Sequence, residues 1–325
     1  MIKPEKPLEQ ISKALIGYLS AQTGDPAIDY ETPLTQMQGG YETCTYRFKL
    51  SGAPQGVSHP LVLRLYPRRY GPDNALWEST IQSVLADQGY PVACVHWTCT
   101  DLSVLGGAFF VMALLPGALM TTVPFETIPG MMGTTHAHLH GVDPEPVVRA
   151  LQERGFDERR YRLGGRMDQL QHRASEHPWL KEGVEWLVEN RPPEPERLVI
   201  CHGDFHPLNI LVQDGKVTGV LDWPGFIVAD PVLDIANTIT LTEISAKYML
   251  GLKNPETVIQ VYLGAYRAQR PLDLGALDYY RARRCIHALV EGAEGQQVWR
   301  QPGIVADLLA TTHEVTGIRI IPPSP

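Results

Sequence analysis

The segment CHGDFHPLNILV, residues 201–212, is the stretch from which the fold of this 325-residue chain can be argued. Within eight positions it carries two histidines, an aspartate and an asparagine, which are His202, Asp204, His206 and Asn209. An apolar run follows them directly. The cluster fits a metal site, a catalytic loop or a polar turn that leads into a strand. The residues after it help to distinguish these three interpretations.

The residues after the cluster predict a β-hairpin. Two apolar runs, 210–212 and 217–221, are separated by Asp214-Gly215, which is a strong hairpin-turn sequence. Folding the chain on that turn places Asn209 at the open end of the hairpin and Asp222 just beyond the same end. We therefore expect an amide oxygen and a carboxylate to converge there, with Asp204 one short loop earlier.

These side chains suit two kinds of chemistry. Oxygen ligands from three residues match the preference of a hard cation such as Mg²⁺. A carboxylate just before them can accept or orient a proton. The alternative is structural: Asn209 and Asp222 cap strand ends, and Asp204 makes a loop turn. For each residue alone the structural interpretation is favoured, but the joint spacing favours a site.

Two motifs then resemble a known family. HGDFHPLN at 202–209 resembles the catalytic loop of the aminoglycoside phosphotransferase family, which includes choline- and homoserine-kinase-like enzymes, and is a variant of the protein-kinase loop H-R-D-x-x-x-x-N. VLDWPGFIVADPVLDIA at 220–236 resembles the next family motif. Further similarity extends over roughly residues 30–290, including a glycine loop at 37–48 and a hinge at 110–117.

The resemblance implies an α+β, protein-kinase-like fold with a small β-rich N-lobe, residues 1–113, and a larger, mostly helical C-lobe, residues 114–325. Residue patterns agree with this division. The first ~115 residues contain several strand-like runs and few helical ones. In LVLRLYP at 61–67, Leu61, Leu63 and Leu65 point one way and Arg64 the other. Later helices are expected near 128–140, 145–154, 165–190, 254–268 and 275–292.

The same resemblance implies roles for the residues of the loop and hairpin. Asp204 would orient the acceptor hydroxyl and take up its proton, and His206 would lie near the γ-phosphate. Asn209 and Asp222 would hold Mg²⁺ against ATP, with GTP left open. The reaction implied is transfer of the γ-phosphate to a hydroxyl of a small molecule, which needs mainly positioning and charge neutralisation.

The resemblance also assigns nucleotide-binding residues, and two of them depart from the usual pattern. The set is Gly39, Gly40, Arg64, Glu78, Met112 and Leu114. Arg64 stands where the family usually has the lysine that pairs with Glu78, and arginine is longer and planar. After the two glycines the chain reads Tyr-Glu-Thr rather than the common x-Ser-Asn. These departures leave open a nucleotide-binding pseudokinase that acts through partners.

Other clusters are interpreted as structural. The histidines of HAHLH at 136–140 lack an accompanying H-E-x-x-H pattern, so a zinc site is disfavoured. The run Arg281, Arg283 and Arg284 is interpreted as a solvated helix face, with contact to an anionic substrate as the alternative. A protein kinase is disfavoured because no A-P-E segment follows Asp222.

Composition limits the partners and leaves the acceptor open. The net charge is −8, so we expect no nucleic-acid and no membrane partner. Five scattered cysteines and a polar N-terminus favour a reduced, cytoplasmic protein. Residues 241–325 carry nine Lys+Arg and eight Asp+Glu, a balance of 9 − 8 = +1. That balance weakly disfavours an aminoglycoside-resistance kinase, because aminoglycosides are polycations; the oligomeric state stays open.

Overall fold

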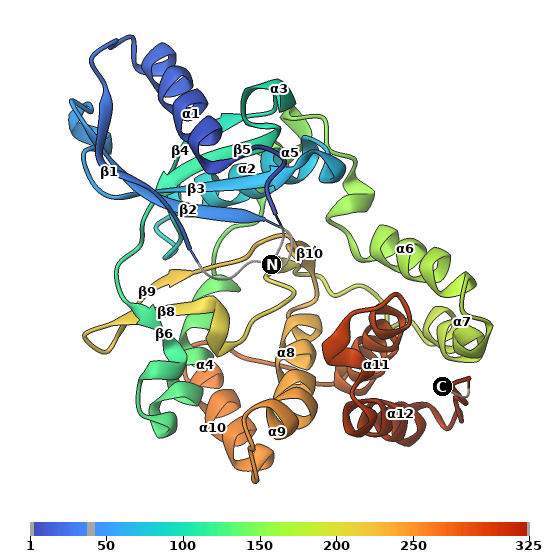
Figure 1. Cartoon of the computed structure of the whole chain (residues 1–325). Helices are drawn as coiled ribbons and strands as arrows, with labels where there is room; N and C mark the ends of the chain where they lie inside the picture. Colours follow the sequence, from blue (N-terminus) through green and yellow to red (C-terminus); the bar gives the residue numbers. More distant parts are fainter. Residues whose placement is uncertain (1–2, 38–42, 324–325) are drawn as a thin grey trace. The chain divides into compact units, whose positions relative to one another are not determined.

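The computed structural model describes residues 3–37 and 43–323. The chain forms two compact units, and it passes between them several times (Figure 1). The first unit comprises Met1–Ala118, Arg149–Leu151 and Leu211–Pro224; the second comprises Leu119–Val148, Gln152–Ile210 and Gly225–Pro325. The α+β class is confirmed, with an antiparallel sheet in the N-terminal part and a largely helical remainder. The division into a nucleotide-binding N-lobe, residues 1–113, and a catalytic C-lobe, residues 114–325, stays a prediction.

The first unit is built on a five-stranded antiparallel sheet with the order β1-β2-β3-β5-β4. The strands are β1 (Asp29–Gln36), β2 (Cys44–Ser51), β3 (Leu61–Pro67), β4 (Val95–Cys99) and β5 (Gly107–Ala113). Three helices accompany them: α1 (Leu8–Thr23), α2 (Asp73–Asp87) and α3 (Leu102–Leu105). Strand β3 is central, so both of its edges are paired, with β2 and with β5.

The alternation predicted for β3 is confirmed. Leu61, Leu63 and Leu65 are buried in one apolar cluster together with residues of α1. Val62 and Tyr66 belong to a second cluster on the α2 side. Because Arg64 shares the parity of those two residues, its side chain also leaves the sheet on the α2 side.

The hairpin predicted around Asp214-Gly215 is present. It consists of β8 (Ile210–Gln213) and β9 (Lys216–Val220), and β6 (Ala118–Leu119) completes the order β6-β8-β9. Asp214 and Gly215 have φ angles of 51° and 72°, as a type I′ turn requires. The hairpin is held to the rest of the first unit: the Val220 N–H donates to Pro91 O at 2.7 Å.

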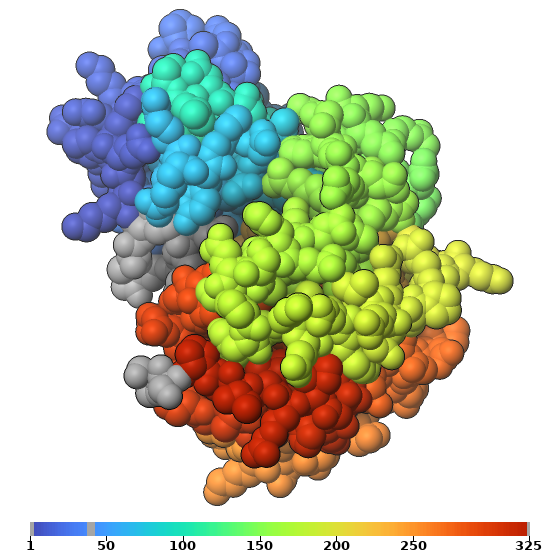
Figure 2. Space-filling model, turned by 90° about the vertical axis from the view of Figure 1, so that its right-hand side faces the viewer, coloured from blue at the N-terminus to red at the C-terminus, as the bar shows by residue number. Residues whose placement is uncertain are grey.

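The second unit is mainly helical around a small sheet of β7 (Val199–Cys201) and β10 (Ile227–Ala229), which pair antiparallel. The helices after β6 are α4 (Ile128–Leu139), α5 (Glu145–Glu153), α6 (Leu163–Ser175), α7 (Lys181–Glu189), α8 (Pro231–Thr240), α9 (Ala246–Met249), α10 (Pro255–Arg267), α11 (Leu277–Ala293) and α12 (Pro302–Thr316). Figure 2 shows the side on which the yellow-green 163–189 segment lies against the dark red α12.

The observed helices differ from the predicted ones in two ways. The segment 165–190 was expected to be one helix, but it breaks into α6 and α7 at His177-Pro178, because a residue before proline avoids the helical region. Helices α8 and α12 were not predicted.

No helix among residues 3–37 and 43–323 is long and apolar enough to cross a membrane.

Candidate functional site

The polar loop 202–209 leaves β7 through a residue that must be glycine. Gly203 has a φ of 84°, which side chains other than glycine rarely adopt. A Cβ at this position would also collide with the carbonyl oxygen of Gly225, on the segment that enters β10. The chain therefore turns sharply just before Asp204, and the 3₁₀ turn Pro207–Asn209 then leads into the hairpin.

A buried carboxylate of α8 holds the start of this loop. Asp234 is fully buried, and it accepts the backbone N–H of His202 at 2.6 Å and that of Gly203 at 2.9 Å. Burial alone would raise the pKa of Asp234, but its neighbours His136 and His140 outweigh burial and hold that pKa well below its ordinary value. Asp234 is thus an ionised acceptor that fixes the backbone ahead of Asp204.

Two further residues of α8 hold the loop from the same helix face. Asn237 donates through Nδ2 to Gly203 O at 3.2 Å, and the Thr238 hydroxyl donates to Phe205 O at 3.0 Å. Asp234, Asn237 and Thr238 are spaced i, i+3 and i+4, so they share one face. Asn237 and Thr238 were not among the residues predicted to support the loop. Asp230-Pro231, a good N-cap and first-turn pair, could have revealed the helix that carries them.

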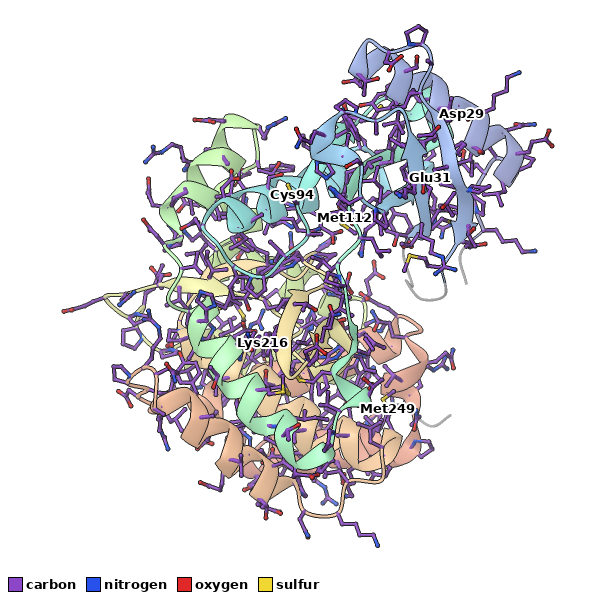
Figure 3. The ribbon with its side chains drawn as sticks, turned by 90° about the vertical axis from the view of Figure 1, so that its left-hand side faces the viewer. Asp29, Glu31, Cys94, Met112, Lys216 and Met249 are labelled. Carbon is purple, nitrogen blue, oxygen red and sulfur yellow. The ribbon has the colours of Figure 1, made fainter. Side chains whose placement is uncertain are left out.

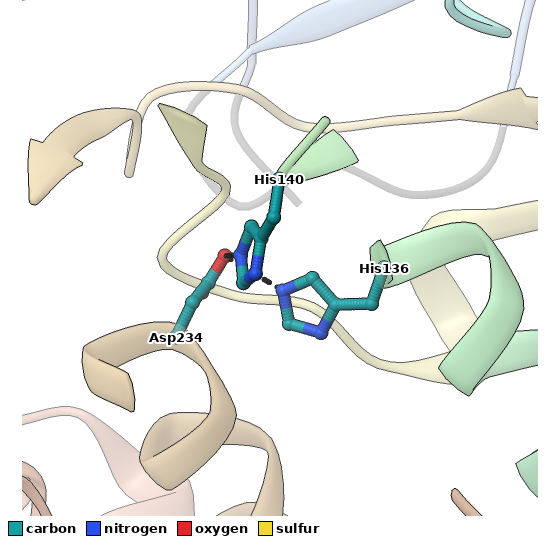
Figure 4. Close-up of side chains that lie close together, drawn as sticks. All are labelled: His136, His140 and Asp234. Carbon is teal, nitrogen blue, oxygen red and sulfur yellow. Dashed lines mark hydrogen bonds and ion pairs between the residues drawn. The ribbon is translucent and has the colours of Figure 1, made fainter. Parts of the chain in front are cut away.

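Asp234 also meets two histidines, one on α4 and one at its C-cap, and among residues 3–37 and 43–323 these three side chains form a His/Asp cluster close enough to hold a metal ion (Figure 4). His136 Nε2 lies 2.9 Å and His140 Nε2 lies 3.6 Å from Asp234 Oδ2. The remaining ring nitrogens contact tyrosine hydroxyls of α10, His136 Nδ1 at 2.7 Å from Tyr262 and His140 Nδ1 at 2.8 Å from Tyr266. Hydrogen bonds occupy both ring nitrogens of His136 and the Nδ1 of His140, whereas the buried His140 Nε2 makes none and only faces Asp234. Three of the four ring nitrogens are thus used within the protein, which supports the structural interpretation of the histidines.

Asp204 presents a half-exposed carboxylate in this rigid setting. Its side chain is 45% exposed, and its Oδ2 lies 3.3 Å from His206 Nε2 and 3.4 Å from Asn209 Nδ2. Burial acts to raise the pKa of Asp204, but the His206 hydrogen bond and the nearby charges of His206, His202 and Arg284 outweigh it. The pKa of Asp204 is therefore lowered, and the group is a carboxylate at neutral pH.

Asn209 keeps an oxygen available. Its Nδ2 donates to the backbone oxygen of Asp204 at 3.0 Å, so the Oδ1 faces away from that bond. Within the described ranges the Oδ1 accepts no hydrogen bond, whereas Nδ2 also contacts His206 at 3.3 Å. An amide oxygen left in this way is a suitable ligand for a hard cation.

The first unit contains a separate cluster of charges around Arg64. Arg64 Nε lies 3.1 Å from Glu78 Oε2, and Arg64 Nη2 lies 2.6 Å from Asp222 Oδ1. The Tyr66 hydroxyl donates to the same Glu78 carboxylate. The pairing of Arg64 with Glu78 expected from the sequence is present. Asp222 has a φ of 69°, a left-handed conformation that Asp tolerates better than most residues.

Burial sets the protonation of this cluster. Burial raises the pKa of Glu78, and the charge of Arg64 opposes that rise. Burial disfavours the charge of Arg64, but Glu78 foremost and then Tyr66 and Asp222 outweigh it, so the pKa of Arg64 lies well above its ordinary value. Arg64 is thus a permanent cation that bridges two acidic side chains.

The remaining predicted nucleotide residues lie at the end of β5 or outside the described residues. Met112 is 8% exposed and belongs to the apolar cluster on the α2 side of the sheet, with Cys94 nearby (Figure 3). The Leu114 N–H donates to Pro60 O at 2.9 Å. Gly39 and Gly40 lie outside the described residues.

The structure therefore brings the predicted residues together in two groups. Asp204, His206 and Asn209 form one group in the second unit. Arg64, Glu78 and Asp222 form the other in the first unit. Convergence of Asn209 with Asp222 stays a prediction that rests on the hairpin.

Comparison with known proteins identifies relatives of the chain. A model of the phosphotransferase enzyme family matches residues 33–274, more than half of the chain. An aminoglycoside 3'-phosphotransferase of Streptomyces fradiae is 31% identical over 235 residues, covering 69% of this chain and 85% of that protein. Acyl-CoA dehydrogenase family member 11 of Homo sapiens is 25% identical over 282 residues, and this chain spans 33% of its length and matches over 78% of its own.

Solved structures share the fold. The macrolide 2'-phosphotransferase of Brachybacterium faecium has a TM-score of 0.59 at 20% identity, covering 97% of this chain and 99% of that one. An aminoglycoside phosphotransferase in a ternary complex with AMP-PNP and hygromycin B has a TM-score of 0.51 at 16% identity, covering 94% of this chain and 96% of that one. Because the family model matches most of the chain and the Streptomyces fradiae relative is 31% identical, this chain belongs to the phosphotransferase enzyme family.

Proposed function

We propose that the chain is an ATP- and Mg²⁺-dependent phosphotransferase that moves the γ-phosphate to a hydroxyl of a small molecule. The observation that carries the proposal is the half-exposed carboxylate of Asp204, held in a loop whose backbone is fixed by α8. Phosphoryl transfer asks the protein mainly to position the reactants and to neutralise charge, and a rigid loop serves the first need.

In this mechanism Asp204 accepts a hydrogen bond from the acceptor hydroxyl and takes up its proton as the phosphate is transferred. The lowered pKa of Asp204 keeps the carboxylate ionised, so it is ready to accept. His206, 3.3 Å from the same carboxylate, would lie near the γ-phosphate. It would hold the orientation of Asp204 and offer a donor to phosphate oxygens.

The donor set fits Mg²⁺. Asn209 offers an amide oxygen and Asp222 a carboxylate whose side chain is 46% exposed, and both are hard ligands. A bound magnesium ion would neutralise charge on the triphosphate. The hairpin between the two residues links them in sequence, which supports assigning both to one ion.

The nucleotide is assigned to the first unit. Arg64, oriented by Glu78, would contact phosphate oxygens, and Gly39 and Gly40 would offer backbone N–H groups. Met112 and Leu114 would line the adenine site at the end of β5. The complex of a structural relative with AMP-PNP supports an adenine nucleotide. GTP is the competing nucleotide in the test.

The proposal is tested by ADP release from ATP with a panel of hydroxyl compounds. Asp204→Asn should lower kcat by about 100-fold or more, because it removes the proton acceptor. The matched control is Asp214→Asn at the tip of the same hairpin, where asparagine also suits the positive φ of 51°. Equal turnover by wild type and Asp204→Asn would refute the role of Asp204.

A second candidate, a nucleotide-binding pseudokinase that acts through partners, is favoured by one contact. Arg64 Nη2 lies 2.6 Å from Asp222 Oδ1, and this ion pair competes with a metal ion for the Asp222 carboxylate. ATP binding without Mg²⁺ dependence and without turnover would support this candidate. An aminoglycoside acceptor, suggested by the Streptomyces fradiae relative, is a third outcome of the same panel.

A further inference from the structure

Helices α6 and α11 pack against each other in the second unit, and both carry basic side chains. They are Arg166 and Arg173 on α6, and Arg283, Arg284 and His287 on α11. The interpretation of Arg283 and Arg284 as a solvated face is wrong, since each is only 8% exposed. Buried arginines are rare unless they are paired, so the partners of each one matter.

Carboxylates compensate only part of this charge. Glu294 pairs with Arg173 at 2.6 Å. Glu291 lies 3.1 Å from Arg284 Nη1 and 3.7 Å from His287 Nδ1. The Arg284 guanidinium also stacks over the ring of Trp299, with its carbon 4.5 Å from the ring centre. These two glutamates are therefore occupied by Arg173 and Arg284.

Arg166 and Arg283 are left without a carboxylate. The Nε of Arg283 is fully buried with no hydrogen-bond partner, and no residue in 3–37 or 43–323 forms an ion pair with its guanidinium. Among the described residues, the acceptor of Arg166 is a backbone oxygen, that of Phe226, at 3.1 Å. Arg283 is buried and Arg166 is partly buried. A buried cation without a counter-charge destabilises a folded protein, so the arrangement favours an anion that binds there.

The pKa values reflect the same crowding. Burial foremost, and then the charges of Arg283 and Arg160, lower the pKa of Arg166 to about 10. Burial also lowers the pKa of Arg283; Tyr279, Tyr280 and Glu291 oppose that shift, and the like charge of Arg284 adds to it. An anion placed between Arg166 and Arg283 would relieve their mutual repulsion.

Arg166 lies next to the loop that carries Asp204. Phe226, whose oxygen binds Arg166, follows Gly225, and the Gly225 oxygen packs against Gly203. Arg166 is thus attached to the segment that touches the residue just before Asp204. All of these residues belong to the second unit.

We propose that Arg166 and Arg283 bind an anionic group, a carboxylate or a phosphate, of the acceptor whose hydroxyl faces Asp204. The inference rests on the proposed phosphotransferase function and names its substrate class. Two planar guanidinium groups suit the oxygens of a carboxylate or phosphate. Anchoring the acceptor away from its hydroxyl would orient the reacting end. A polycationic acceptor would be repelled by the same pair.

A first experiment measures thermal unfolding of the full chain with and without inorganic phosphate. Without phosphate, Arg283→Gln should raise Tm, because it removes an unpaired buried charge; a merely structural arginine would lower Tm when replaced. The matched control is Arg281→Gln on the same helix, which breaks the 2.8 Å pair with Glu243 and should lower Tm. A lower Tm for both variants would overturn the proposal.

Adding phosphate tests binding directly. Millimolar phosphate should raise the Tm of wild type more than that of Arg283→Gln, and Arg166→Gln should behave like Arg283→Gln. Phosphate bound elsewhere, for example near Arg64, would raise Tm equally in all three. An equal rise, or no rise in wild type, would overturn the proposal. These readouts need no turnover.

A second experiment compares acceptors in the ADP-release assay. Hydroxy acids and alcohol phosphates should be used in preference to the matching amides and unphosphorylated alcohols. For the acid, Arg283→Gln should raise KM about 10- to 100-fold, with the KM of ATP unchanged. Equal use of acid and amide would overturn the inference. If phosphate binding depends on Arg283 but no acceptor causes ADP release, the proposed function is refuted, and the anion-binding site is still supported.

Discussion

Replacing His140 with glutamine should remove a specific part of the pH dependence of stability. His140 is 1% exposed and lies between Asp234, His136 and Tyr266. Burial foremost, and then the neighbouring His136, lower its pKa from 6.5 to about 4. The folded protein therefore holds His140 neutral at pH values at which the unfolded chain protonates it.

The sign and size of the effect follow from linkage. Between pH 4 and pH 6.5 the unfolded chain binds one more proton at this position, so stability falls as the pH falls through that window. With pKa values of 6.5 unfolded and about 4 folded, lowering the pH from 7 to 5 should cost about 2 kcal/mol through His140. That is roughly a 30-fold change in the ratio of folded to unfolded protein.

The assay is urea unfolding at pH 7, 6 and 5, followed by tryptophan fluorescence, for wild type and His140→Gln. Glutamine keeps a polar group near the Tyr266 hydroxyl but does not titrate. The difference in unfolding free energy between the two proteins should shrink by about 2 kcal/mol from pH 7 to pH 5. His138→Gln, an exposed position on the same helix, is the control and should follow wild type. Parallel loss of stability by wild type and His140→Gln would refute the reasoning.

Three further substitutions test the framework of the site. Arg64→Met leaves the buried Glu78 without its cationic partner and should destabilise the chain by about 3 kcal/mol in urea unfolding. Combining it with Glu78→Gln should recover most of that loss, and no recovery would contradict the reasoning. Gly203→Ala combines a φ of 84° with a clash against the Gly225 oxygen, so it should lower Tm and turnover together; a wild-type Tm would contradict the geometry. Asn237→Ala removes one hydrogen bond to the loop and should cost about 1 kcal/mol in urea unfolding; a cost above about 3 kcal/mol would show a larger role.

Features set by local sequence were predictable. The hairpin follows from Asp214-Gly215 between two apolar runs, because only a few residues accept two successive positive φ angles. The two faces of β3 follow from alternation, since successive side chains of a strand point to opposite sides. The interpretation of residues 202–209 as a catalytic loop rests on the resemblance of HGDFHPLN to a family motif, and it stays a prediction.

Features set by distant contacts were not predictable. Asp234 receives hydrogen bonds from His136, 98 residues earlier, and from the loop at 202–203, and no local pattern encodes that meeting. Arg283 was interpreted as solvated because a run of basic residues is most often a solvated helix face. It is buried because α11 packs against several other helices, and no local pattern encodes those contacts.

The central claim is that this chain binds ATP through Mg²⁺ held by Asp222, and calorimetric titration tests it most directly. ATP should be titrated into wild type and Asp222→Ala, each with and without Mg²⁺, with GTP as the competing nucleotide. The account predicts ATP binding by wild type that strengthens with Mg²⁺ and loses that dependence in Asp222→Ala. No nucleotide binding by wild type under any condition, or the same Mg²⁺ dependence in both proteins, would contradict it.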